Sequence, residues 1–314
     1  MTRINGYIIA AAAAVLSAFA ATPADAVPTP EQLGNITYKG IFEHAITLKN
    51  GHWVGEPFVA GGSSRPAVGL IDDFILTGDL NGDGKDEAVV LLWENTGGSA
   101  TYIYLAVTGM RDNKPYTLDT ALIGEHVQVR AGRIVGNMIE LDVVQQGPRD
   151  AACCPSQTAT RYWDLDATGL HVNPPRITGT LSLADLAGTE WVLKRLDVNE
   201  PLEGQPEITL VFDGDRISGK SACNRYFAEA KEGGELPGDL HISDIGGTRM
   251  ACPEEVMNLE NRYLEALGSV TRYSFMAGKL ALSWRKNGAS GDLLFIPRQP
   301  QQPQCVGDQS RQAR

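Results

Sequence analysis

The sequence is poor in the residues that most often build thiol and metal sites. Its 314 residues include only five cysteines and five histidines, and no cysteine precedes Cys153. A lipid anchor on a thiol near the N-terminus is therefore not expected. No two histidines share the short spacing typical of zinc ligands, so a zinc site has little support. The histidines are His44, His52, His126, His171 and His241.

The chain also lacks several catalytic signatures, and its net charge is not positive. The chain has no G-x-S-x-G elbow, no phosphate-binding loop and no dinucleotide fingerprint. A Ser-His-Asp triad assembles only in space, so the sequence does not decide that case. Lys and Arg number 27 against 38 Asp and Glu, a formal net charge of −11. Such a surface repels phosphate, which argues against nucleic acid and anionic lipid and leaves cations, apolar ligands or proteins as partners.

The first residues have the three parts of a secretory signal peptide. Arg3 precedes an apolar run from Tyr7 to Ala21, and Ala24-Asp25-Ala26 forms a small-x-small exit. At about fifteen residues the run is shorter than the roughly 20 that a spanning helix needs. We expect cleavage after Ala26, residues 1–26 as the signal peptide, a periplasmic or secreted product and no membrane span.

The rest of the chain is long enough for two domains. Alternating apolar residues from 36 to 59, interrupted by Asn50-Gly51, predict a hairpin, and further strands follow up to residue 165. We expect a β-rich N-terminal domain at 27–170, a linker at 171–180, a second domain at 181–297 and a disordered tail at 298–314. A turn is expected from Gly109 to Lys114. The predicted class is α+β and mostly β.

A loop from Asp79 to Glu87 has the spacing of a calcium site. Oxygen side chains fall at its positions 1, 3, 5 and 9, Gly84 permits the bend, and the Lys85 carbonyl falls at position 7. Position 12 is Val90 in a β-branched run, so the loop joins strands. The pattern resembles the calcium β-loop of FG-GAP and VCBS repeats. We expect a structural calcium ion at Asp79, Asn81, Asp83, Lys85 and Glu87; the alternative is a turn that never holds metal.

Cys153 and Cys154 are adjacent, and neighbouring cysteines form only a strained ring with each other. We therefore expect at least one of them to bond elsewhere, with Cys305 as a candidate partner. With five cysteines, at least one thiol is left over or pairs between chains. A redox-active pair is the alternative to a structural bond or a buried thiol.

The C-terminal part combines strands with one helix. Pro253-Glu254-Glu255 starts the helix, and Gly268 ends it. An apolar face is set by Val256, Leu259, Tyr263 and Leu267. Three short sequence motifs accompany these elements: Leu186-Ala187-Gly188-Thr189-Glu190-Trp191, Ser221-Ala222-Cys223-Asn224-Arg225-Tyr226 and Thr248-Arg249-Met250-Ala251-Cys252-Pro253.

In the order and content of these motifs, the chain resembles the META (HslJ-like) domain over about residues 181–297. The resemblance implies a curved antiparallel sheet packed on one main helix, and an association with bacterial envelope stress or with motility and secretion in flagellate parasites. It implies no reaction. By position, Cys223 and Cys252 belong to its two cysteine motifs, and a disulfide between them is expected in an oxidising compartment. Asn224, Arg225, Thr248 and Arg249 either line a polar surface site or cap the sheet, and the structural role is favoured.

Two functions follow as hypotheses. The first is an exported, non-catalytic envelope protein that binds a protein or envelope ligand during stress. The alternative is a periplasmic hydrolase or thiol-redox enzyme with an unrecognised site near Cys153 and Cys154.

Overall fold

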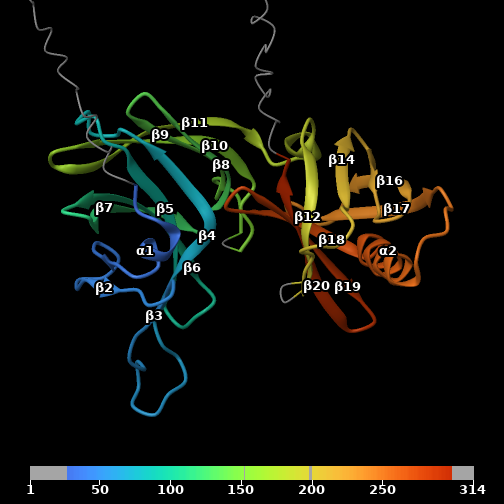
Figure 1. Ribbon diagram of the computed structural model, residues 1–314, viewed down its shortest axis with the longest axis horizontal. Helices are drawn as coiled ribbons and strands as arrows, with labels where there is room; N and C mark the ends of the chain where they lie inside the picture. The colour runs from blue at the N-terminus through green and yellow to red at the C-terminus, as the bar shows by residue number, and fades with distance from the viewer. Residues whose placement is uncertain (1–26, 152, 198–199, 299–314) are drawn as a thin grey trace, which may run out of the picture.

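The computed structural model describes residues 27–151, 153–197 and 200–298. The expected signal peptide, the tail beyond residue 298 and Cys305 lie outside these ranges. Strands make up 57% and helices 8% of the structure, which confirms the mostly β, α+β class. Figure 1 shows two groups of strands, one built from the N-terminal half and one from the C-terminal half.

The N-terminal half holds one short helix and three antiparallel sheets. Five strands follow the order β3-β4-β5-β6-β7, four follow β11-β10-β9-β8, and β1 pairs with β2. The elements are α1 (Pro30–Leu33), β1 (Thr37–Tyr38), β2 (Ile46–Thr47), β3 (His52–Val54), β4 (Ala67–Gly78), β5 (Glu87–Asn95), β6 (Thr101–Arg111), β7 (Lys114–Glu125), β8 (Gln128–Val135), β9 (Met138–Gln145), β10 (Gln157–Asp166) and β11 (Gly169–Thr180).

Strand β5 is buried on both faces, because it lies between two hydrophobic clusters. Side chains alternate across a strand, so Val89 and Leu91 enter one cluster with Trp163 of β10. Val90 and Leu92 enter the other with Tyr38 of β1. The continuous apolar run after the acidic loop is therefore a central strand.

Three sequence expectations for this half need correction. Residues 171–180, expected as a linker, form most of β11, which pairs with β10. Pro174 and Pro175 fit there because β11 is an edge strand, where a missing N–H costs little. The turn expected from Gly109 to Lys114 is limited to Asp112 and Asn113, which both adopt positive φ angles, since strand pairing continues through Arg111 and resumes at Lys114. The tight turn at Asn50-Gly51 is confirmed, with φ angles of 50° and 81°. The hairpin expected around it is not formed, because β2 pairs with β1 and β3 with β4, and only the single Lys49–His52 bridge spans the turn.

The C-terminal half is one curled nine-stranded antiparallel sheet around helix α2. Eight strands follow the order β17-β16-β15-β14-β12-β20-β19-β18, and β13 pairs with β12. The elements are η1 (Leu183–Leu186), β12 (Glu190–Asp197), β13 (Glu200–Pro201), β14 (Thr209–Asp213), β15 (Arg216–Lys220), β16 (Arg225–Glu232), β17 (Leu240–Gly247), α2 (Glu254–Leu267), β18 (Val270–Met276), β19 (Lys279–Lys286) and β20 (Ala289–Pro297).

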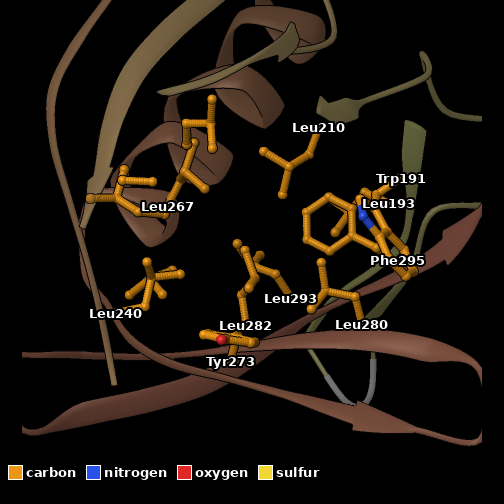
Figure 2. Close-up of a cluster of buried hydrophobic side chains, with 14 of the residues drawn as sticks. Trp191, Leu193, Leu210, Leu240, Leu267, Tyr273, Leu280, Leu282, Leu293 and Phe295 are labelled. Carbon is orange, nitrogen blue, oxygen red and sulfur yellow. The ribbon is translucent and has the colours of Figure 1, made fainter. Parts of the chain in front are cut away.

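The sheet curls until its two ends meet. The Tyr273 N–H, on β18, donates to the Gly238 carbonyl before β17 at 2.8 Å, and Arg272 bonds Asp239 at 2.9 Å. Inside the curl, Leu267 of α2 packs with side chains of the surrounding strands (Figure 2), and Tyr263 and Leu267 are completely buried. The expected apolar face of this helix is thereby confirmed.

The two halves contact each other through β8 and the β18–β19 turn. The Gly278 N–H donates to the Val129 carbonyl at 2.9 Å, and Lys279 Nζ lies 3.0 Å from Asp73 Oδ2. Arg130 forms an ion pair with Asp185 at 2.8 Å and lies over the Phe275 ring. Ala277 belongs to the N-terminal hydrophobic cluster although it comes from the C-terminal half.

Candidate functional site

A buried carboxylate on α2 connects the two cysteine-bearing segments. Glu260 is only 5% exposed. One of its oxygens accepts from Ser221 Oγ and the Asn224 N–H, both at 2.7 Å, and from the Cys223 N–H at 3.2 Å. Its other oxygen accepts from Asn224 Nδ2 at 2.8 Å. The turn from Ser221 to Asn224 is thus fastened to the helix.

These hydrogen bonds determine the charge of Glu260. Burial alone would raise its pKa, because it disfavours the ionised form. The donors on Asn224, Ser221 and Cys223 outweigh burial and hold the pKa of Glu260 below its ordinary range. The side chain is therefore a saturated, ionised acceptor, which suits positioning and does not suit proton donation.

Asn224 joins the same turn to the second cysteine segment. Its Oδ1 accepts from the Met250 N–H at 2.7 Å and from Thr248 Oγ1 at 2.8 Å, and its Nδ2 also donates to the Met250 carbonyl at 3.3 Å. The Cys223–Cys252 disulfide closes this arrangement, with an S–S distance of 2.06 Å. The expected disulfide is confirmed. Buried Asn224 and exposed Thr248 accordingly join the two cysteine-bearing segments.

Above this support lies an exposed surface that we name the basic face: Lys220, Arg225, Phe227, Arg249 and Met250. Phe227 is 63% and Met250 57% exposed. Arg225 and Phe227 are two residues apart on β16, so they point to the same side of the sheet. Two large apolar side chains are therefore exposed, Phe227 on the same side of β16 as Arg225 and Met250 next to Arg249 in the chain.

The charges of the basic face are compensated only in part within the described residues: after the hydrogen bond from Arg298, the charge of Lys220 helps to lower the pKa of Glu207. Lys220 and Arg225 are directly opposite each other across β15 and β16, an arrangement that destabilises a sheet when both side chains carry the same charge. None of its three cations has an ion-pair partner in the part of the chain that the structure describes. On a chain of net charge −11, this face is a local exception that an acidic partner would neutralise.

The loop expected to hold calcium is closed by its own hydrogen bonds. Asp79 accepts from the Gly82 and Gly84 N–H groups at 2.7 and 2.9 Å. Glu87 accepts from the Leu80 N–H and from Asn81 Nδ2. Burial, followed by the charges of Asp83 and Asp79, raises the pKa of Glu87. The oxygen donors suit calcium chemically, but over 27–151, 153–197 and 200–298 no three or more His, Cys, Asp or Glu side chains are grouped to hold a metal.

Cys153 and Cys154 are bonded to each other, so the expectation that at least one of them pairs elsewhere is wrong. Their loop is held by Asp150, which accepts from the Gly147 N–H and from the Ser156 N–H and Oγ, each at 2.7 Å. Cys154 is buried and Cys153 exposed.

Reading the sequence missed Glu260, the residue on which the cysteine segments depend. Four Glu residues lie in the helix from Glu254 to Leu267, and none of them stands out by type. The available signal was position: residue 260 follows Leu259 and precedes Tyr263 on the apolar face. A carboxylate on that face needs buried donors, which points to a partner segment.

Comparisons with known proteins identify a family for most of the C-terminal half. The META domain family profile matches residues 184–298. A solved structure of a protein from Burkholderia xenovorans is 24% identical, covers 38% of this chain and 87% of its own, and has a TM-score of 0.28. The β-propeller domain of the Trilobed protease from Pyrococcus furiosus is 10% identical in sequence and has a TM-score of 0.18. The match covers 80% of this chain and 84% of that domain. No curated protein matches the chain. Residues 184–298 are thus a META domain.

Proposed function

We propose that this protein is an exported, non-catalytic envelope protein whose META domain binds another protein through the basic face. The observation that carries the proposal is the exposure of Phe227 and Met250, which lie close in the chain to Arg225 and Arg249, two cations without a salt bridge in the described residues. Exposed aromatic, methionine and arginine side chains are enriched at protein interfaces. The matching partner is an acidic segment that carries an apolar side chain.

The support beneath the basic face favours binding over catalysis. Glu260, Asn224 and the disulfide fix the backbone on both sides of Arg225 and Met250. A surface fixed before binding loses less conformational entropy when a partner docks. No helix of the described residues is long and apolar enough to cross a membrane, and the disulfides are consistent with an extracytoplasmic protein. Periplasmic or secreted localisation, a role in envelope stress and a structural calcium ion at 79–87 are parts of the same proposal.

Capture from the native envelope tests the proposal. Full-length protein is crosslinked in place, and bound proteins are identified by mass spectrometry. We expect a specific partner that is lost in the Phe227→Ser, Met250→Ser double variant and in Arg225→Glu. The matched control is Val172→Ser with Ile177→Ser, because both side chains are exposed on β11. A partner lost equally from the control, or retained by all variants, contradicts the proposal.

One observation favours a second function, thiol-disulfide exchange at Cys153 and Cys154. The pair is already oxidised, and exposed Cys153 is accessible to an attacking thiolate. A dithiol reductant would supply two electrons and two protons, leave both cysteines as thiols and become a disulfide. The test is a thiol count after exposure to a dithiol at physiological poise. Two new reactive thiols at 153 and 154 support exchange, whereas an unchanged count excludes it.

A further inference from the structure

A cleft on the META domain lies apart from the residues of the basic face. It lies between the C-terminal half of α2, the β12–β13 region and the β19–β20 hairpin, and has a volume of about 460 Å³. That size is within the range of small-molecule sites. Its lining includes Leu196, Glu200, Arg262, Glu265, Trp284 and Lys286.

The aromatic wall of the cleft presents carbon. Trp284 is half-buried, but its Nε1 is buried and has no hydrogen-bond partner in the described residues. Gly291, its cross-strand neighbour, lies against that edge, since a Cβ there would be 3.0 Å from Nε1. The polar edge of the indole is therefore turned inward. Trp284 lines the cleft together with Leu196 and Ala266.

Four charged groups of the cleft are paired with one another. Arg262 binds Glu200 in a two-point contact, with Nη1 to Oε1 at 2.8 Å and a second contact between Nη2 and Oε2. Lys286 Nζ lies 2.6 Å from Glu265 Oε1. A charged ligand would have to break one of these pairs and leave a charge without its partner. A neutral ligand would leave both pairs intact.

We propose that this cleft binds a neutral saccharide unit. A pyranose ring has an apolar C–H face that packs on an aromatic ring, as apolar groups pack on indole carbon elsewhere. Its hydroxyls both donate and accept, so they match the carboxylate oxygens of Glu200 and Glu265 and the N–H groups of Arg262 and Lys286. An apolar peptide side chain would cover Trp284 but would leave the rim groups without new hydrogen bonds. The combination of indole carbon and paired ions favours the sugar.

Titration of the full-length protein tests this inference. The probes are glucose, N-acetylglucosamine and its β-1,4-linked dimer, with glucuronate as a charged sugar and an uncharged leucine-containing tripeptide as the peptide arm. We expect saturable binding of at least one neutral sugar in the millimolar range, followed through indole N–H resonances. Glucuronate and the tripeptide should bind at least about fivefold more weakly.

Variants assign the binding to the cleft. Trp284→Phe and Arg262→Gln should each weaken it about fivefold or more. Trp93→Phe is the matched control, because Trp93 is also half-buried over a strand glycine, Gly69, but is outside the cleft. Arg262→Gln changes only an exposed group, which keeps the test valid if Trp284→Phe unfolds.

Three results would overturn the inference: no saturation by any neutral sugar up to about 50 mM, well above weak specific binding; equal loss in Trp93→Phe; or tighter binding of the tripeptide. The Phe227→Ser, Met250→Ser variant should keep full sugar binding. Failure of the cleft is thereby distinguished from failure of the basic face.

Discussion

A single side chain, Glu260, connects the helix of the META domain to both cysteine segments through Asn224 and the Ser221–Asn224 turn. Ala222 within that turn has a φ angle of 83°, a region that non-glycine residues rarely occupy. The backbone is held there by the surrounding bonds, of which those to Glu260 form the largest group. The stability of the motif should therefore depend strongly on this one carboxylate.

Glu260→Gln should lower the free energy of unfolding at pH 7 by about 2–4 kcal/mol. The amide keeps the size of the side chain but removes the charge and places a donor among donors. Denaturant unfolding measures the change. Glu255→Gln, at an exposed position in the first turn of α2, is the control and should change stability by less than about 0.5 kcal/mol.

The same residue predicts a pH dependence with a definite sign. Because the pKa of folded Glu260 is below its ordinary value of 4.5, its ionised form stabilises the fold. That contribution is fully present above the unfolded pKa and is lost as pH falls through the folded pKa. The stability difference between wild type and Glu260→Gln should shrink below about pH 4.5. A difference that stays constant down to pH 3 would contradict this assignment.

Among single residues, the sequence predicted the disulfide cysteines but not the carboxylate beneath them. The expectation for Asn224 and Thr248 as fasteners is supported, whereas Arg225 and Arg249 are exposed. Side-chain type alone does not separate these cases. What separates them is the hydrogen bonds that Asn224 and Thr248 make within the protein, since only Arg225 of the four lies in a strand. Strand β16 was not predicted because its buried positions alternate through small Ala228 and Ala230, which give a weak apolar signal.

At the scale of elements, the Cys223–Cys252 disulfide links the start of β16 to the segment before α2. The sequence separation is 29 residues. A crosslink that closes a loop of that size reduces the entropy of the unfolded chain and so raises the free energy of unfolding by about 3–4 kcal/mol. Cys223→Ser with Cys252→Ser should lower stability by that amount under oxidising conditions. Under reducing conditions the wild type should match the variant; a persisting difference would show that serine itself disturbs the site.

The 79–87 loop supplies a metal prediction. Seven carboxylates and one lysine lie between Asp72 and Glu94, so a bound cation would relieve repulsion. We expect the protein to melt several degrees higher in millimolar calcium than in EDTA. Asp83→Asn should remove the calcium effect without lowering the melting temperature in EDTA. Identical melts of the wild type in both buffers would eliminate the metal.

Sequence patterns predicted most of the elements where apolar alternation was strong. The helix of the META domain is confirmed, whereas its strands β13 and β16 were not predicted. Strand β11 was predicted as linker because Pro174 and Pro175 suggest an irregular segment, and only its edge position makes them compatible with a strand. The Cys153–Cys154 disulfide was not predicted, because ring strain between adjacent cysteines favoured pairing elsewhere. The hydrogen bonds by which Asp150 holds this loop cannot be seen in the sequence.

At the scale of the whole molecule, the two halves are joined by a specific contact. Arg130 of β8 pairs with Asp185 and lies over Phe275, while Gln128 Oε1 accepts from the Phe275 N–H at 2.9 Å. The periodicity of apolar residues along the chain does not report on such long-range contacts. Two halves were therefore expected from the sequence, but the interface between them was not.

Arg130→Met should uncouple the halves. The change leaves partly buried Asp185 without its cation, at a cost of about 2–3 kcal/mol. Calorimetry should show a single transition in the wild type and two separable transitions in the variant. The control is Arg133→Met on the same strand, whose partners Glu140 and Asp142 belong to the N-terminal half. Two transitions in that control as well would argue against a specific role for Arg130.

The central claim is that the basic face is where a protein partner docks, and site-specific photo-crosslinking tests it most directly. A photoreactive amino acid replaces Ser218, which is exposed and directly opposite Phe227. The same group placed at Val172 on β11 serves as the reference. The account predicts a partner-specific crosslink from position 218 that weakens at high salt and is absent from position 172. A partner crosslinked only from position 172, or equally from both, would contradict it.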